Sequence, residues 1–183
     1  MEIKKIFIPG VLIIKPEVFI DDRGFFLESW NQKNLFNSSG INDNFVQDNH
    51  SRSTLKGVLR GLHYQLNFPQ GKLVRAVSGS ILDVVVDLRK SSPTFGKYFS
   101  IELNDENNFQ LWVPVGLAHG FLTLSNNTDV IYKTTEYYFP NDESCIKWDD
   151  VNLGIDWKLK GDKPKLSNKD EKGIAFNTAK YFL

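Results

Sequence analysis

Apolar and polar residues alternate most regularly across residues 81–89. Every second position, from Leu82 to Leu88, holds a branched aliphatic residue, while Asp83 and Asp87 occupy positions between them. An extended chain turns successive side chains to opposite faces, so this pattern is typical of a β-strand. We expect a half-buried antiparallel strand with one apolar and one polar face.

Short apolar stretches recur along the rest of the chain, separated by residues that favour turns. Further extended segments are predicted at residues 6–19, 25–30, 45–51, 98–103, 111–113, 120–124 and 129–138. One short helix is expected at residues 31–36, ended by the polar loop 37–40, and no helix longer than two turns is expected before the C-terminus. Many short strands without long helices predict an all-β domain, either a closed barrel or two packed sheets.

Length and charge narrow the class of protein. A chain of 183 residues suits one domain, residues 1–183, with a single core. It contains 22 lysines and arginines and 22 aspartates and glutamates. This balance argues against nucleic acid and membrane surfaces as partners. The 14 phenylalanines, 6 tyrosines and 4 tryptophans favour strands and pockets for planar ligands.

The cysteine count and the N-terminal residues bear on the compartment. Cys145 is the only cysteine, which excludes an internal disulfide and a cysteine-rich metal site and fits a reducing compartment. Three lysines, a proline and a glycine interrupt the apolar residues among the first 15. We therefore expect neither a signal peptide nor a membrane span, and a cytoplasmic location.

Charged residues are unusually dense among the apolar residues of 57–75. Arg60, His63, Lys72 and Arg75 lie there, and burying such groups is costly unless they meet partners or a ligand. An internal site that binds an anion is therefore expected. Strict alternation would put Arg60 and His63 on opposite faces. A bulge or twist at Gly61 would bring them to the same face, and the sequence does not decide whether one exists.

Residues 45–51 contain several amide side chains. This segment fits either an exposed polar edge strand or a strand that binds a ligand, and its sequence does not decide between them.

Residues 114–119 have the P-x-G-x-x-H spacing of the second motif of the cupin barrels, which they resemble, and His119 would be the metal ligand of that motif. The first motif is degenerate, because His63 is followed by Gln65 instead of a second histidine and Lys72 stands where an acid is expected. An ammonium repels cations, so no metal site is predicted. The alternative for His119 is a buried histidine bonded to backbone groups.

Together, these segments resemble the dTDP-4-dehydrorhamnose 3,5-epimerases. The motifs that carry the resemblance lie at residues 22–28, 45–49, 57–65, 70–75, 92–96, 116–121, 147–150 and 166–170. They cover nearly the whole chain in one order. One departure is the loop 66–69, which is slightly shorter than the proline-rich loop of the family.

The resemblance implies a cupin-type jelly-roll barrel with short peripheral and C-terminal helices. The core would span about residues 20–140, and the C-terminal segment would pack back on the site. It also implies a homodimer without cofactor or metal that inverts C3 and C5 of dTDP-4-dehydro-6-deoxy-D-glucose, giving dTDP-4-dehydro-L-rhamnose for dTDP-rhamnose biosynthesis. Two alternatives are a single-carbon epimerase or ketoisomerase acting on a nucleotide-linked 4-keto sugar, and a non-catalytic sugar-binding cupin.

Inverting a carbon beside a ketone needs a base, a group that holds the enolate oxygen, and an acid on the opposite face. His63 is the candidate base because imidazole titrates near neutral pH. Lys72 is the candidate for the enolate oxygen and Tyr132 for the acid. Each of these residues also has a structural alternative, which is the commoner case for an isolated residue of its type. His63 would be a histidine held in a strand, Lys72 a solvated lysine and Tyr132 a tyrosine of the core.

Asp170 has two interpretations. Residues 167–170 resemble a capping box, which predicts a helix start. The resemblance implies instead that Asp170 orients His63 and stabilises its imidazolium form.

The family pattern also implies residues that contact the nucleotide sugar. Arginines suit the diphosphate, amides suit the edge of the base, and one phenylalanine, Phe26, suits the thymine ring. The implied residues are Arg23, Phe26, Glu28, Gln47, Asp48, Asn49, Arg60, His119, Tyr138, Glu143 and Lys169.

Overall fold

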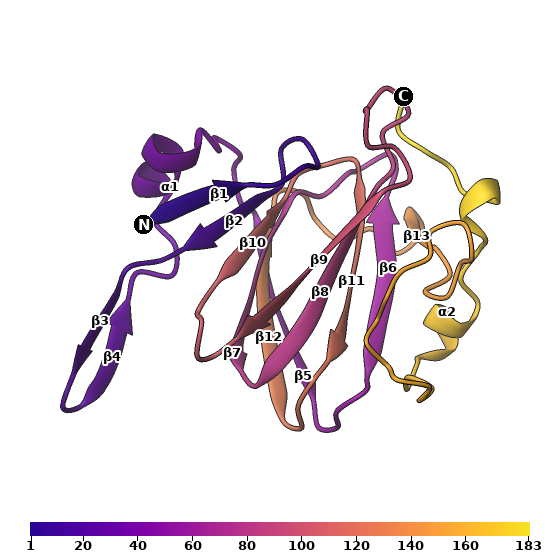
Figure 1. Cartoon of the computed structure of the whole chain (residues 1–183). Coiled ribbons are helices and arrows are strands. Elements are labelled where there is room, and N and C mark those ends of the chain that lie inside the picture. The colour runs from indigo at the N-terminus through magenta and orange to yellow at the C-terminus, as the bar shows by residue number, and fades with distance from the viewer.

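Two antiparallel β-sheets packed face to face form the body of the computed structural model, which describes all 183 residues (Figure 1). The first sheet has the strand order β1 (Glu2–Lys5), β2 (Leu12–Lys15), β10 (Gln110–Val113), β7 (Lys72–Ser78), β12 (Thr128–Thr134) and β5 (Gln47–Ser53). The second has the order β13 (Glu143–Cys145), β6 (Leu59–Gln65), β11 (Leu117–Thr123), β8 (Ser80–Asp87) and β9 (Tyr98–Asn104). The chain crosses repeatedly between the sheets, and the predicted all-β jelly-roll class is confirmed.

The strands β3 (Val18–Asp21) and β4 (Gly24–Leu27) pair only with each other and form a hairpin. This hairpin projects away from the two sheets (Figure 1). The strand predicted at residues 25–30 is shorter in the structure, where β4 ends at Leu27. The segment predicted at 45–51 is shifted, because β5 begins at Gln47 and continues to Ser53.

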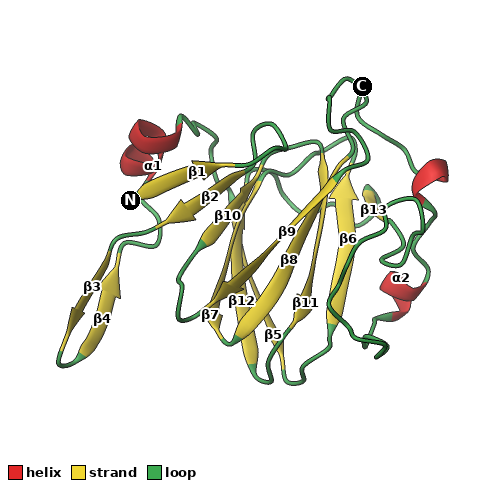
Figure 2. Cartoon of the chain, in the orientation of Figure 1, coloured by secondary structure: helices red, strands yellow, loops and turns green.

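The helices are short and lie at the periphery (Figure 2). They are α1 (Gln32–Ser39), α2 (Asn168–Glu171) and a 3-10 turn (Phe176–Thr178). Asn31 caps α1 by accepting a hydrogen bond from the Asn34 backbone, and Gly40 ends it with a left-handed φ of 77°. The helix predicted at 31–36 exists and ends three residues later. No helix is long and apolar enough to cross a membrane.

The prediction that residues 81–89 form a half-buried strand was wrong about burial. The face of β8 with Ile81, Asp83 and Val85, which the alternation marked as the polar one, points between the sheets. The opposite face, with Leu82 and Val84, is buried as well, because the C-terminal segment covers it. Alternation distinguishes the two faces of a strand, but it does not tell which faces another part of the chain will cover.

Apolar side chains form three layers. One cluster lies between the sheets and includes Val74, Val85 and Phe121. A second lies between the outer face of the five-stranded sheet and the C-terminal segment, and a third between the outer face of the six-stranded sheet and α1. Burial of these aliphatic and aromatic groups, each contributing about 1.5–3 kcal/mol, holds the sheets in register around the polar cavity described below.

The structure has a bulge at Gly61, which the sequence had left open. His63 pairs with His119 and Arg60 pairs with Phe121, so β6 has two residues where β11 has only Gly120. Gly61 has a φ of 116°, and the two strands approach each other closely at this residue. A side chain would not fit, because a Cβ atom there would lie 2.6 Å from Gly120 Cα. The peptide bond that follows Gly61 is cis. The extra residue turns both Arg60 and His63 toward the space between the sheets.

Candidate functional site

A polar cavity of about 520 Å³ opens between the two sheets. Strands β5, β6, β7, β11 and β12 supply most of its wall. The rest comes from β13, from residues 167–170 and from the loop residues Gln70 and Tyr138. Eleven of the residues predicted for the site line it: Gln47, Asn49, Arg60, His63, Lys72, His119, Tyr132, Tyr138, Glu143, Lys169 and Asp170.

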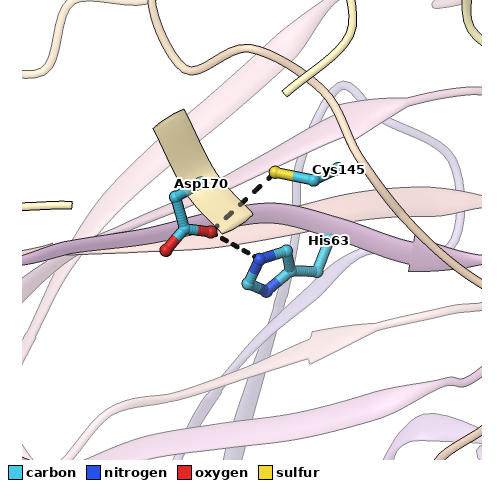
Figure 3. A group of neighbouring side chains, drawn as sticks. All are labelled: His63, Cys145 and Asp170. Carbon is cyan, nitrogen blue, oxygen red and sulfur yellow. Dashed lines mark hydrogen bonds and ion pairs between the residues drawn. The ribbon is translucent and has the colours of Figure 1, made fainter. Parts of the chain in front are cut away.

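Among the contacts between an imidazole and a carboxylate at this cavity, the contact between His63 and Asp170 is the shortest. The Nε2 atom of His63, on β6, lies 2.6 Å from Oδ1 of Asp170, on α2 (Figure 3). The structure contains both the predicted helix start and a contact between Asp170 and His63. Ser167 caps α2 by accepting a hydrogen bond from the Asp170 backbone, and its hydroxyl donates to Oδ2 of Asp170 at 2.6 Å. The helix start therefore positions the carboxylate that holds His63.

Asp170 is 3% exposed and nevertheless ionised. Burial alone would raise its pKa, but hydrogen bonds from His63 and Ser167 outweigh burial and bring the pKa to about 2. A carboxylate accepts only, so the Nε2 atom of neutral His63 carries the hydrogen. The other ring nitrogen, Nδ1, then has a free lone pair, and it lies 3.8 Å from Oε1 of Glu143.

Glu143 links three predicted residues at the edge of the cavity. Its Oε2 atom accepts hydrogen bonds from Lys169 Nζ at 2.6 Å and from the Tyr138 hydroxyl at 2.8 Å. Burial would raise the pKa of Glu143, but Lys169 and His63 lower it. The hydrogen bond to Glu143 is the main reason that the pKa of Tyr138 is raised. This group therefore places an anion beside the imidazole.

Lys72 lies on β7 and is only 9% exposed. Burial lowers the pKa of its ammonium to about 8, against the opposing effect of Glu143 and Asp83. The Lys72 ammonium forms no ion pair, because Glu143 is paired with Lys169 and Asp83 with His119. A buried ammonium beside a cavity is suited to an oxygen atom that bears negative charge.

Tyr132 lines the cavity from the other sheet. It lies on β12, whereas His63 lies on β6 of the five-stranded sheet. Burial is the main reason that the pKa of the Tyr132 phenol is raised, followed by the charge of Glu143. The phenol therefore keeps its proton at neutral pH and can donate it.

His119 is buried, and its partner is a carboxylate instead of the backbone. Its Nε2 atom lies 2.7 Å from Oδ1 of Asp83, which is fully buried, and Oδ2 of Asp83 has no hydrogen-bond partner. The alternation places Asp83 on a polar face and does not predict this contact. The available signal was an acid surrounded by aliphatic residues between Ile81 and Val86.

Asp48 is a correction to the predicted set. Gln47 and Asn49 point into the cavity, where the Gln47 amide donates to Asn49 at 2.8 Å. Asp48, between them on β5, points to the outer face of the sheet and pairs with Lys133 at 2.8 Å. The two-residue period of a strand separates neighbours that the motif had grouped together.

Three further predicted residues lie away from the cavity of their own chain. Arg23 is in the turn of the projecting hairpin and pairs with Asp21, and Phe26, on β4, is 69% exposed. Glu28 follows the hairpin and accepts hydrogen bonds from two asparagine side chains. Lining residues that the prediction did not include are His50, Ser51, Arg52, Gln70, Gly120, Phe121 and Ser167.

The degenerate cupin positions have other partners. The Gln65 side chain donates to the carbonyl oxygens of Phe68 and Tyr137 and accepts from the Phe139 backbone, so it anchors two loops.

Atoms of a kind that can bind metal lie close together in a different cluster, formed by His63, Cys145 and Asp170. The pKa of the Cys145 thiol is raised to about 12, chiefly by burial and then by the charge of Asp170.

Known proteins resemble the chain over nearly its whole length. The family model described as dTDP-4-dehydrorhamnose 3,5-epimerase matches residues 5–178. A relative of that name from Pseudomonas aeruginosa is 52% identical over 182 residues, covering 100% of this chain and 99% of the relative.

Solved structures resemble it in fold as well. The Legionella pneumophila dTDP-6-deoxy-D-glucose-3,5-epimerase, in complex with dTDP-4-keto-L-rhamnose, superposes with a TM-score of 0.94 at 47% identity, covering 98% of this chain and 94% of that one. A 3'-monoepimerase from Streptomyces bikiniensis, in complex with dTDP-quinovose, has a TM-score of 0.89 at 32% identity, covering 98% and 89%.

Proposed function

The chain belongs to the dTDP-4-dehydrorhamnose 3,5-epimerase family, and from that membership we propose how its cavity acts on a nucleotide sugar. It is an isomerase of dTDP-rhamnose biosynthesis. The substrate is dTDP-4-dehydro-6-deoxy-D-glucose, whose C3 and C5 are inverted to give dTDP-4-dehydro-L-rhamnose. Each inversion removes a proton beside the C4 ketone and returns one to the opposite face.

His63 removes the protons. Its Nδ1 atom bears the free lone pair, because Nε2 donates its hydrogen to Asp170. When Nδ1 takes a proton from C3 or C5, the ring becomes a cation, and the buried Asp170 carboxylate stabilises it at 2.6 Å. Glu143, 3.8 Å from Nδ1, adds to this stabilisation.

Lys72 holds the oxygen of the enolate. Loss of the α-proton moves negative charge onto the C4 oxygen, and an ammonium that is already desolvated interacts strongly with that charge. Burial of Lys72 supports this role, since the ammonium needs little reorganisation when the charge develops.

Tyr132 returns the proton. Its position on the sheet opposite His63 fits delivery to the other face of the sugar ring, and its raised pKa keeps the phenol protonated. The polar residues around these groups bind the rest of the substrate, with Arg60 suited to the diphosphate and Gln47 and Asn49 to hydrogen-bonding edges.

The observation that carries this proposal is the placement of a base with a free Nδ1 atom and a phenol on opposite walls of one cavity. The test is proton NMR of a panel of 4-keto sugar nucleotides in deuterium oxide. We expect deuterium at both C3 and C5, together with the inverted product. Turnover without exchange, or binding without either, would contradict the proposal.

A single-carbon epimerase is the second candidate, supported by the likeness to a 3'-monoepimerase of the same fold. The same NMR experiment separates the two. Inversion and deuterium confined to one carbon would favour the second candidate.

A homodimer is the oligomeric state that we propose, with the β3–β4 hairpin reaching the cavity of the second copy. Four large apolar side chains on this hairpin are exposed to between 56% and 81%: Phe19, Ile20, Phe25 and Phe26. Exposed apolar groups on a projecting hairpin favour a partner surface. The arrangement would bring Arg23, Phe26 and Glu28 to a substrate that their own chain does not place near them.

A further inference from the structure

Three potential metal ligands converge behind the base. Cys145 on β13 is the direct cross-strand partner of His63 on β6, and Asp170 reaches both from α2 (Figure 3). One ring nitrogen of His63, Sγ of Cys145 and a carboxylate oxygen of Asp170 lie within 4.8 Å of one another. The Cys145 thiol donates to Oδ1 of Asp170 at 3.8 Å. This His63–Cys145–Asp170 cluster lies on the Nε2 side of the ring, away from the Nδ1 atom that faces Glu143.

The ligand types and spacings suit a borderline-soft divalent ion, of which zinc is the commonest in proteins. Zinc binds imidazole, thiolate and carboxylate at about 2.0–2.3 Å, so tetrahedral ligand atoms lie roughly 3.3–3.6 Å apart. The separation of Cys145 Sγ and Asp170 Oδ1 is 3.8 Å. The 2.6 Å contact between His63 and Asp170 would have to open, by roughly 0.7 Å on the same geometry.

The surroundings would hold these ligands in place. Ser167 donates to Oδ2 of Asp170 and the Gly61 backbone donates to Oδ1, which fixes the carboxylate as outer hydrogen bonds do in metal sites. His63, Ser167 and Asp170 all line the cavity, so an ion can reach the cluster from there. The cavity also provides room for a water molecule as the fourth ligand.

We propose that the His63–Cys145–Asp170 cluster is an inhibitory binding site for Zn²⁺. Bonds form from the metal to Nε2 of His63, Sγ of Cys145 and Oδ1 of Asp170. The thiol proton leaves to solvent, and the hydrogen on Nε2 moves to Nδ1, because a neutral imidazole that ligates through one nitrogen carries its hydrogen on the other. Nδ1 then has no lone pair, and His63 can no longer remove a proton from the substrate.

The inhibition rests on the proposed role of His63, whereas zinc binding does not. The test therefore measures both. The full-length protein is freed of metal with a chelator and titrated with Zn²⁺ against a fluorescent competitor, and epimerase activity is followed in parallel. Cys145→Ser and Cys145→Ala are compared with the wild type, since the mechanism makes no use of Cys145. His50→Gln is a control for zinc binding at the pair formed by the exposed His50 and the buried Asp129.

We expect one zinc ion per chain, loss of activity and of deuterium exchange on binding, and recovery with chelator. Both Cys145 variants should keep wild-type activity without zinc and bind zinc at least about tenfold more weakly. Cadmium should produce thiolate–metal absorption in the wild type and not in Cys145→Ser. His50→Gln should bind zinc as the wild type does.

Equal zinc affinity of the wild type and the Cys145 variants, or Cys145-dependent binding that leaves activity intact, would overturn the proposal. Should the proposed function itself be wrong, the zinc-free protein would lack epimerase activity while the Cys145-dependent binding and the cadmium absorption remained.

Discussion

The side chains of His63 and Asp170, which are 107 residues apart in the chain, meet at 2.6 Å between Nε2 and Oδ1. This contact occupies Nε2 and leaves Nδ1 with a free lone pair, and Nδ1 is the atom that we propose removes the protons. Both the proposed reaction and the proposed zinc inhibition depend on it.

The first prediction concerns this pair. His63→Asn should lower kcat by about 10² to 10⁴, because it removes the base and leaves the cavity in place. Asp170→Asn should cause a smaller loss, since the imidazole remains without its anionic partner. The double variant should lose far less than the product of the two single losses, because the residues act as a unit. Steady-state kinetics test this, with dTDP affinity as the control for an intact cavity. Wash-out of the C3 or C5 hydrogen at the wild-type rate in His63→Asn would assign the base to another group.

The second prediction separates the two faces of the sugar. Tyr132→Phe removes the acid without touching His63, so the enolate should still form and take its proton back from the face it left. NMR in deuterium oxide should then find deuterium in the starting 4-keto sugar, with inversion strongly reduced at one or both carbons. Tyr138→Phe is the matched control for loss of a phenol at the same cavity. Inversion by Tyr132→Phe at the wild-type rate would exclude Tyr132 as the acid and direct attention to Tyr138.

The third prediction concerns pH. In the proposed mechanism Lys72 stabilises the enolate only in its protonated form, and its pKa is lowered to about 8. The value of kcat/KM should therefore fall as pH rises through about 8, well before an ordinary lysine would titrate. Lys72→Arg should remove this fall, because a guanidinium stays charged throughout the range. A kcat/KM that is constant to pH 10 in the wild type would show that this ammonium is not required.

The fourth prediction tests the homodimer. Arg23→Ala carries a defective hairpin and His63→Asn a defective base, so each should be inactive or nearly so by itself. If the hairpin serves the partner, a mixed dimer contains one complete site, formed by the cavity of the Arg23→Ala chain and the intact hairpin of the other. Random mixing should therefore restore about one quarter of wild-type activity.

Mixing should be carried out by joint refolding, with the mass of the assembly measured by light scattering. Absence of recovery from dimers that have demonstrably exchanged chains would mean that the hairpin does not complete the partner's site.

The fifth prediction concerns stability away from the cavity. Asp87 is fully buried, and its carboxylate accepts hydrogen bonds from Arg89, Ser92 and Thr94. Burial would raise its pKa, but these bonds outweigh it and lower the pKa from 3.8 to about 2. Since the folded pKa is depressed, the stabilisation is complete above pH 4 and is lost as pH falls from about 4 to 2, by about 2 kcal/mol in total.

Asp87→Asn should therefore lower the free energy of unfolding at pH 7 and flatten its dependence on pH between 4 and 2. Urea unfolding across this range measures both. An exposed acid such as Glu106 offers the control, because Glu106→Gln should leave the pH dependence unchanged. Parallel profiles for the wild type and Asp87→Asn would contradict the assignment.

The sequence by itself determined the local elements. Two-residue alternation located β8 and β9, turn residues separated the strands, and the Ser167 capping box marked the start of α2. These features depend on contacts between residues close in the chain, so the sequence contains them directly. The sequence marked Gly61 as the place where a bulge or twist would bring Arg60 and His63 into one cavity, and the structure showed that a bulge forms there.

The tertiary structure decided which faces are covered and which distant groups meet. The C-terminal segment buries the second face of β8, the strand β5 turns Asp48 away from the cavity, and Asp83 finds His119 on the neighbouring strand. Alternation defines the two faces of a strand without saying what lies against either. Pairs such as His63 and Asp170 arise only when the packing of both sheets brings separate segments together, because no local interaction encodes contacts across more than a hundred residues.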